Sequence, residues 1–374
     1  MSRMSRTEPF AITMWDFSWL ERRWPGAGFE DWGVALDELA ERGYNAVRID
    51  AYPHLVAAGA TDTWDLTPQW NQQSWGAQSA ISVRVLPELA EFIAAARDRN
   101  IGVALSTWFR HDSTAQRMRI TTPQKLADIW LTTLDLLDAE GVLDNVLYVD
   151  LCNEFPMPYW APFMYGVAQG LGYDRSHPEV TRWFDETIAA MKAQRPEFEY
   201  TFSFAMQLDT WREQNIESLD FIEPHVWMAG CTGSDYYDRV GYNFEQFTST
   251  GYDNVVKRGE AVYRADQERY DSLLMAEIDR MADWSRATHK ALVTTECWSI
   301  VDYKDWPGLD WGWVMDLNAR AVEYAVSRGR WLGVATSNFC APQFVGNWRE
   351  IEYHQRLTSL IRSSRLDADL RDAV

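Results

Sequence analysis

Short apolar runs alternate along the chain with longer segments in which apolar residues recur at helical spacing. The clearest helical segment starts after Thr122, a good N-terminal cap, has Pro123 at its first position and stops at Gly141. Its buried face is predicted to be the stripe Leu126, Ile129, Trp130, Thr133, Leu134 and Leu137. Strands separated by such helices are typical of a parallel sheet that is covered by helices.

The predicted strands are short apolar or β-branched runs. They are Ala11–Asp16, Asn45–Asp50, Ile101–Trp108, Val146–Glu154, Tyr200–Ala205, Phe221–Trp227, Ala291–Trp298 and Gly333–Cys340. Helices are predicted between and after them, at Trp32–Ala40, Leu86–Ala96, Pro123–Leu137, Pro178–Arg195, Asp266–Thr288, Trp311–Arg328 and Ile351–Arg362.

This order favours an α/β fold of the (β/α)8 TIM barrel class. We expect residues 1–374 to form a single catalytic domain with long connections after strands two, four, six and seven. No glycine-rich phosphate loop follows any of the strands. An open, doubly wound sheet that binds a dinucleotide is therefore the weaker alternative.

Composition narrows the class of protein. Apolar residues make up 47% and charged residues 24% of the chain, which is typical of a globular protein with a substantial core. A formal net charge of −20 argues against a nucleic acid partner. The N-terminus lacks the apolar run of a secretory signal, and no apolar stretch of about 20 residues predicts a membrane span. We therefore expect a cytoplasmic protein without a membrane partner, and the oligomeric state stays open.

Cysteine spacing and tryptophan content also bear on function. The four cysteines lie far apart and lack the paired spacing of zinc sites, so we expect no metal and no cofactor. The chain has 20 tryptophans. Some would fill the core between barrel and helices, and the others would form apolar platforms for sugar rings.

Two predicted strands each end on a glutamate. Strand four leads to Glu154 and strand seven to Glu296. In barrels of this class the chemistry lies at the C-terminal ends of the strands, and strands four and seven are nearly opposite in the ring. Their carboxyls are thus expected to face one another at about 5 Å, the separation of a retaining glycoside hydrolase.

Three motifs resemble those of a known group of enzymes. The run Asn153–Pro156 resembles the Asn-Glu-Pro signature of clan A glycoside hydrolases, and Thr295–Trp298 looks like the strand that carries their nucleophile. The run Gly43–Ile49 is similar to the second-strand motif of family 5 cellulases. The resemblance extends over all eight predicted strands and implies a divergent, cellulase-like member of clan A.

The resemblance also implies roles for individual residues. Glu154 would be the general acid/base and Glu296 the nucleophile. Arg48 would lie beneath Glu296 and keep it ionised, since an adjacent guanidinium lowers the pKa of a carboxyl. Asn153 would bind the sugar 2-hydroxyl, and His225 matches a histidine of the family. Each of these residues also has a purely structural interpretation, as an ion-pair partner or a rim residue.

The chain departs from the family pattern at several strand ends. Trp227 replaces the tyrosine that normally contacts the nucleophile, and the eighth strand ends around Asn338 without its usual tryptophan. Asp150 falls where such enzymes often place an acid, and we expect a structural role for it. Further candidates for sugar binding at the strand ends are Trp15, Asp16, Tyr52, Trp108, His111 and Trp298, with Asp50 and His54 close by.

The function predicted from these residues is retaining glycoside hydrolysis of a carbohydrate substrate. Long connections such as residues 51–82 and 228–252 favour a pocket closed at one end, lined by Trp15, Trp108, Trp227 and Trp298, and hence exo action on a small oligosaccharide or glycoside. The alternatives are an endo-acting β-glucanase or mannanase, a catalytically silent carbohydrate-binding barrel, and a metal-dependent barrel hydrolase. The silent barrel would need neither glutamate, and six scattered histidines offer no His-x-His pair for a metal.

Overall fold

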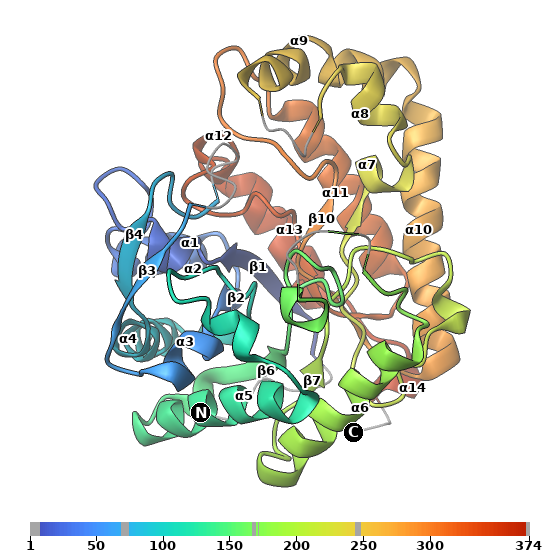
Figure 1. The fold of residues 1–374 in the computed structure, drawn as a ribbon. Coiled ribbons are helices and arrows are strands. Elements are labelled where there is room, and N and C mark those ends of the chain that lie inside the picture. Colours follow the sequence, from blue (N-terminus) through green and yellow to red (C-terminus); the bar gives the residue numbers. More distant parts are fainter. Residues whose placement is uncertain (1–7, 69–74, 167–169, 171, 244–247, 372–374) are drawn as a thin grey trace.

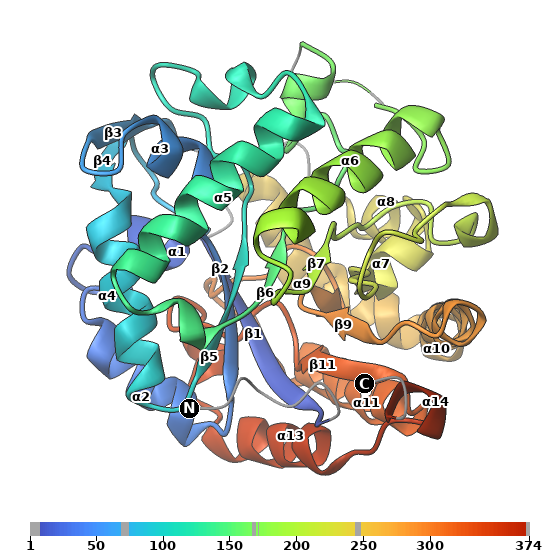
Figure 2. The same ribbon diagram turned by 90° about the horizontal axis from the view of Figure 1, so that it is seen from below.

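A sheet of parallel strands forms the centre of the molecule. The computed structural model describes residues 8–68, 75–166, 170, 172–243 and 248–371. The sheet has seven strands in the order β7-β6-β5-β2-β1-β11-β9, and all of its pairings are parallel. Its strands are β1 (Phe10–Asp16), β2 (Ala46–Asp50), β5 (Gly102–Ser106), β6 (Val146–Asp150), β7 (Tyr200–Thr201), β9 (Leu292–Thr294) and β11 (Trp331–Ala335). Figure 2 shows these strands in the middle, with helices around them.

The predicted sixth strand, Phe221–Trp227, forms only a short strand and two isolated bridges. Strand β8 (Val226–Trp227) pairs with β10 (Cys297–Trp298) in a separate two-stranded sheet. Upstream of β8, single parallel bridges join Ile222 to Leu292 and Pro224 to Phe204. Proline has no N–H to donate to a ladder, which limits regular pairing at this point. The segment thus lies between both edges of the curled seven-stranded sheet without a continuous ladder.

Long helices pack around the sheet (Figures 1 and 2). They are α2 (Trp32–Glu41), α4 (Val85–Arg97), α5 (Pro123–Ala139), α6 (Pro178–Gln194), α10 (Gln267–Thr288), α11 (Gly312–Ser327) and α13 (Ile351–Ser363). Helix α9 (Ser249–Ala265) lies away from the sheet, at the top of Figure 1, and contacts α10. Thr122 caps α5 as predicted, because its side chain accepts a hydrogen bond from the backbone N–H of Lys125 at 3.1 Å. Gly141 follows the helix with φ +70°, a conformation that favours glycine.

Several connections for which the sequence predicted no regular structure contain helices or a hairpin. The connection after β2 contains α3 (Pro53–Ala58) and an antiparallel hairpin of β3 (Thr63–Leu66) and β4 (Ile81–Arg84). The connection after β8 contains α7 (Met228–Cys231), α8 (Asp235–Val240) and the long helix α9. Further short α-helices are α1 (Ser18–Glu21), α12 (Val345–Trp348) and α14 (Ala368–Arg371).

Burial explains why the strands read as nearly continuous apolar runs. Every residue of β1, β2, β5 and β11 is buried, since one face packs on the helices and the other on side chains inside the curled sheet. Polar residues in these strands are thus exceptions that need partners. Among the helices of the described residues, none combines the length and the apolar character that crossing a bilayer requires.

Candidate active site

The two predicted glutamates lie just beyond the C-terminal ends of their strands. Glu154 follows β6 and Glu296 follows β9. The backbone of Glu154 has φ +48°, in the left-handed region that side chains other than glycine seldom adopt. Its N–H donates to Ser203 Oγ at 3.0 Å, which holds the turn in place. This turn brings the Glu154 carboxyl to the rim of the sheet, as a polar residue at a strand end predicts.

The carboxyls of Glu154 and Glu296 meet around one imidazole. An oxygen of each glutamate and a ring nitrogen of His225 all lie within 4.8 Å of one another. His225 Nδ1 lies 3.0 Å from Glu154 Oε1 and 3.6 Å from Glu296 Oε1. The glutamate side chains are 10% and 12% exposed, while His225 is buried. Of these three side chains, the two carboxyls are therefore the ones in contact with solvent.

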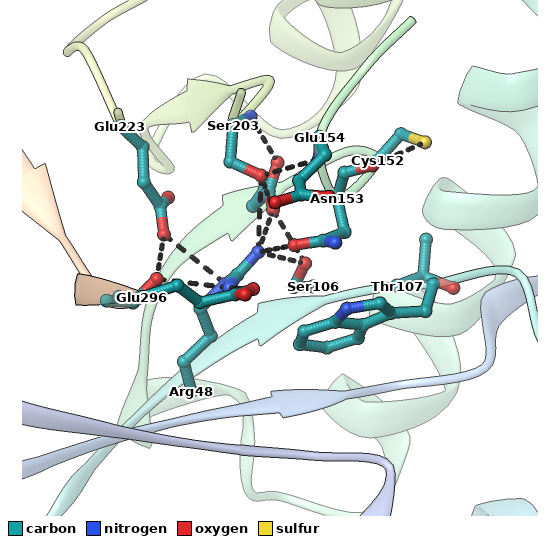
Figure 3. A network of polar contacts seen from close by, with 12 residues as sticks. Arg48, Ser106, Thr107, Cys152, Asn153, Glu154, Ser203, Glu223 and Glu296 are labelled. Carbon is teal, nitrogen blue, oxygen red and sulfur yellow. Dashed lines mark hydrogen bonds and ion pairs between the residues drawn. The ribbon is translucent and has the colours of Figure 1, made fainter. Parts of the chain in front are cut away.

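Arg48 lies beneath Glu296 and binds side chains from several strands (Figure 3). Its Nη1 donates to Glu296 Oε1 at 3.2 Å and to Thr295 Oγ1 at 3.0 Å. Its Nη2 donates to Asn153 Oδ1 at 2.7 Å and to Asp150 Oδ2 at 2.5 Å. The ion pair expected between Arg48 and Glu296 is thus present. Arg48 itself is fully buried, so its charge acts at short range in a site with little water.

Two further carboxyls complete this network of contacts. Asp150 is fully buried and accepts hydrogen bonds from Ser106 Oγ at 2.6 Å and from the N–H and Oγ of Ser203 at 2.9 Å each, which fits the structural role expected for it. Glu223 is also fully buried, and its Oε1 lies 3.3 Å from Arg48 Nε. Sequence reasoning did not single out Glu223. It stands two residues before His225, so the period of two along an extended chain would have placed it on the same face.

Burial dominates the electrostatics of the site. It raises the pKa of Glu154 to about 7, against a smaller lowering by the hydrogen bond from Trp160 and by the charge of Arg48. It also raises the pKa of Glu296, where the charges of His225 and Arg48 oppose the shift and that of Glu154 adds to it. Burial lowers the pKa of His225 to about 4, so the imidazole is neutral at neutral pH.

A neutral His225 suits a carboxyl that gains and loses a proton. With the proton on Nδ1 the ring donates to an ionised Glu154, and with the proton on Nε2 it accepts from the acid form. Trp160 adds a second contact, because its Nε1–H donates to Glu154 Oε2 at 3.1 Å. Trp160 lies in the loop after β6, and no periodicity in the sequence marked it.

Aromatic rings and one amide border the charged groups. The guanidinium of Arg48 lies 4.7 Å from the centre of the Trp108 ring, a cation–π contact. Trp227 packs edge-on against His225 with ring centres 5.9 Å apart, and its buried Nε1 has no hydrogen-bond partner among the residues that the structure describes. Asn153 Nδ2 is also buried and without a partner in the described part of the chain.

Other candidates from the sequence lie away from this centre or are tied to the protein. Trp15 is fully buried against Phe29 and Phe92, and Trp298 is fully buried beside Trp331. Tyr52 is buried, and its hydroxyl donates to Glu21 Oε1 at 3.0 Å.

Three polar candidates remain. His111 is half-buried, with its Nδ1 3.1 Å from Thr67 Oγ1. Asn338 is buried, and its Nδ2 donates to the carbonyl of Val301 at 3.1 Å. Asp16 is buried, and burial raises its pKa well above the usual range, with the charge of Glu296 among the smaller causes.

The loops that were expected to close a pocket are only partly within the described residues. The connection at residues 51–82 includes 69–74, and the connection at residues 228–252 includes 244–247, which lie outside the described residues. The predicted outline of the pocket therefore stays a prediction.

The same atoms could in principle ligate a metal ion. Glu154, His225 and Glu296 offer one ligand atom each at suitable mutual distances. Arg48 lies 3.2 Å from the Glu296 oxygen, however, and its positive charge would repel a cation at that position. The donor set suits a paired-carboxylate reaction on a neutral substrate better than a metal centre.

A strand-end carboxylate pair on a parallel sheet ringed by helices is the arrangement found in glycoside hydrolases of the barrel type. The chain belongs to the cellulase-like family, described as sugar-binding cellulase-like, whose model matches residues 12–362. The resemblance to clan A enzymes is therefore confirmed. No curated protein matches the chain.

Solved structures agree with this class. A candidate glycoside hydrolase from Parabacteroides distasonis is 47% identical, with a TM-score of 0.95 over 98% of this chain and 97% of that one. An endocellulase from Pyrococcus horikoshii, solved with cellotetraose, is 14% identical with a TM-score of 0.50 over 94% and 92%. A GH5_18 protein from Streptomyces cattleya, solved with GlcNAc, is 12% identical with a TM-score of 0.51 over 95% and 80%. The latter two show the fold alone.

Proposed function

We propose that this protein is a retaining glycoside hydrolase that cleaves its substrate by double displacement. The observation that carries the proposal is the approach of Glu154 and Glu296, an oxygen of each lying within 4.8 Å of the other. A separation of about 5 Å lets one carboxylate attack the sugar directly, whereas an inverting enzyme leaves about 6.5–9.5 Å for a water molecule.

In the first step Glu296 attacks the anomeric carbon while Glu154 protonates the departing oxygen. The C–O bond to the leaving group breaks as the bond between Glu296 and the sugar forms, and the proton of Glu154 goes to the leaving group. A pKa of about 7 keeps Glu154 largely protonated in mildly acidic solution. Arg48, 3.2 Å from Glu296, favours the ionised nucleophile.

In the second step a water molecule replaces the leaving group. Glu154, now ionised, removes a proton from the water, whose oxygen attacks the anomeric carbon and releases Glu296. The contacts of Glu154 with His225 and Trp160 suit both of its forms, because the imidazole can donate or accept and the indole N–H stabilises the charge. Two inversions at the same carbon retain its configuration.

We further propose that the enzyme acts from the end of a small oligosaccharide or glycoside. We also propose that the curled sheet and the segment with β8 together form a closed eight-stranded barrel. The low exposure of both glutamates supports a confined site rather than an open groove. Endo action on a β-glucan or mannan is the second candidate, favoured by the fold shared with an endocellulase. Product analysis separates them, since exo action releases one small unit at a time and endo action produces random internal cuts.

The different roles of the two glutamates give the sharpest test. Glu296→Ala should abolish turnover of every substrate, because no glycosyl-enzyme can form. Glu154→Ala should still react with an aryl glycoside whose leaving group needs no protonation, and azide should accelerate turnover to a glycosyl azide of retained configuration. The measurement is the rate for both variants with and without azide, with product anomers assigned by NMR.

Glu277→Gln is a suitable control, since Glu277 is a buried glutamate paired with Arg280 on α10, away from the carboxylate pair. It should react like the wild type. Equal losses in Glu154→Ala and Glu296→Ala without an azide effect, or a wild-type product of inverted configuration, would overturn the proposal.

A further inference from the structure

Glu223 is a fully buried carboxyl that touches the same guanidinium as Glu296. Its Oε1 lies 3.3 Å from Arg48 Nε and accepts a hydrogen bond from Thr295 Oγ1 at 2.9 Å. Thr295 in turn accepts from Arg48 Nη1 at 3.0 Å, and the same Nη1 donates to Glu296. Glu223 therefore lies beside Nε, which makes no hydrogen bond among the described residues, and reaches the guanidinium through Thr295, while Glu296 accepts directly from Nη1 (Figure 3). The mechanism above assigns no task to Glu223.

The charges around Arg48 do not balance if every carboxyl is ionised. Asp150, Glu223 and Glu296 all contact this one cation. Burying an unpaired carboxylate is strongly unfavourable, so a buried excess of carboxyls is met by protonating one of them. Burial raises the pKa of Glu223 to about 8, with the charge of Arg48 opposing the shift and that of Asp150 adding to it.

The contacts indicate which carboxyl best fits the neutral form. Both oxygens of Asp150 accept from hydrogen-bond donors, two serine hydroxyls and one backbone N–H, in addition to Arg48. Glu296 is 12% exposed to solvent. Glu223 is fully buried, and its Oε2 has no hydrogen-bond partner among the described residues. A neutral acid tolerates such surroundings better than a carboxylate does.

We propose that Glu223 is a positioning residue that, as the neutral acid, holds the Arg48 guanidinium in the orientation that ion-pairs Glu296. This proposal rests on the proposed role of Glu296 as the nucleophile. Because a neutral Glu223 adds no negative charge, the charge of Arg48 is shared by Asp150 and Glu296 alone, and Glu296 stays ionised. The titratable and polar groups around Glu223 are Arg48 from β2, Tyr148 and Asp150 from β6, and Thr295 and Glu296 beyond β9.

The test compares Glu223→Gln with Glu223→Ala. Glutamine has the shape of the neutral acid and its carbonyl can accept from Thr295 as Glu223 does, so the acidic limb of kcat/KM should stay at its wild-type pH. Alanine frees Arg48 to move, so kcat should fall about 100-fold with little change in KM, as misplacement by about 1 Å can cause. The acidic limb should also move to higher pH, because Glu296 loses part of its ion pair. The assay uses an aryl glycoside with a good leaving group, on which the protonation state of Glu154 matters least.

A second measurement does not depend on activity. The infrared difference spectrum between wild type and Glu223→Gln at pH 6 should contain the carbonyl band of one protonated carboxyl, shifted in D2O. Glu277→Gln, the buried control, should leave the pH profile unchanged. An acidic limb that moves to lower pH in Glu223→Gln together with no missing carboxyl band would show an ionised Glu223 and overturn the proposal.

Wild-type kinetics in Glu223→Ala would overturn the positioning role. If Glu223→Ala does not fold, the pH profile of Glu223→Gln and the infrared difference spectrum still show whether Glu223 is neutral or ionised. Failure of the proposed function would appear elsewhere, as full turnover by Glu296→Ala or as an inverted product.

Discussion

Arg48 connects the buried polar interior of the sheet to the reacting carboxyls. It replaces water as the partner of Glu296, Asp150 and Asn153, and its guanidinium lies over the Trp108 ring. Burial alone would lower its pKa, but the charges of Glu223, Asp150 and Glu296 outweigh burial and raise it. A lysine would offer a compact charge without this planar set of donors, so the site depends on arginine.

Trp160 should set the alkaline limit of activity through Glu154. Its indole N–H stabilises the charged form of the Glu154 carboxyl and holds the pKa down. Trp160→Phe removes the donor, so the pKa should rise above about 7 and the alkaline limb of kcat/KM should move up by about one pH unit. The measurement is the pH profile on a glycoside with a poor leaving group.

Trp183→Phe is the matched control for this change. Trp183 donates from Nε1 to Glu179 Oε1 at 3.2 Å on helix α6, so the substitution removes the same kind of bond from a carboxyl outside the Glu154 and Glu296 pair. Its pH profile should match the wild type. An unchanged alkaline limb in Trp160→Phe, or an equal shift in Trp183→Phe, would contradict the role of Trp160.

The predictability of single residues follows from where they lie. Glu154 and Glu296 end apolar strands, so their position alone points to the rim. Trp160 lies in a loop whose path no periodicity predicts. Glu223 precedes a proline in an irregular segment, where a structural glutamate and a functional one look alike in sequence. Trp298 shows the converse, because an aromatic residue at a strand end can turn into the core as well as toward a ligand.

At the scale of elements, the bounds of most predicted helices match the structure closely, whereas the predicted strands are longer than the observed ones. The predicted helix Pro178–Arg195 corresponds to α6 (Pro178–Gln194), since capping residues and apolar stripes are local features. The predicted strand Ala291–Trp298 is divided into β9 and β10, because strand pairing depends on neighbours distant in sequence. Helix α9 was missed within a connection rich in polar and aromatic residues.

The N-terminal cap of helix α5 should contribute to the free energy of unfolding without affecting catalysis. Thr122 is exposed and caps α5, so Thr122→Ala should lower the free energy of unfolding by about 1 kcal/mol and leave kcat unchanged. Thr132→Ala is the control on the same helix, because Thr132 is exposed and donates only to the Asp128 carbonyl one turn earlier. Thr132→Ala should leave the free energy of unfolding nearly unchanged. Urea unfolding of both variants tests the prediction, and equal losses would contradict the cap.

At the scale of the whole molecule, the protein keeps many acids inside. Burial raises the pKa of Asp50, Glu154 and Asp302 to about 7 and that of Glu223 to about 8. The net charge of −20 adds repulsion that grows as further carboxyls ionise. The fold is thus built around carboxyls that are more easily protonated than those of the unfolded chain, and its stability must depend on pH.

The sign of this dependence follows from proton binding. Unfolded carboxyls titrate near pH 4, so between about pH 4.5 and 8 the folded protein binds more protons and its stability falls as pH rises. The histidines His54, His225 and His354, whose pKa burial lowers to about 4, act in the opposite direction. Their effect ends near pH 6.5, where unfolded histidine loses its proton. Above pH 6.5 only Lys304, whose pKa burial lowers to about 8, opposes the carboxyls, and it does so mainly at the upper end of the range. The several buried carboxyls outweigh this one amine, and stability should decline.

We therefore expect the melting temperature to be highest on the acidic side of neutrality and to fall from pH 6.5 to pH 8. Each carboxyl still protonated in the fold contributes about 1.4 kcal/mol per pH unit, which corresponds to about 2 °C for a chain of this size. Glu223→Gln should reduce the slope in the same window, because glutamine cannot ionise, whereas Glu352→Gln on the exposed face of α13 should leave it unchanged. Calorimetry across this range at constant ionic strength measures the slope. A melting temperature that stays level or rises between pH 6.5 and 8 would mean that these buried carboxyls are already ionised in the folded protein.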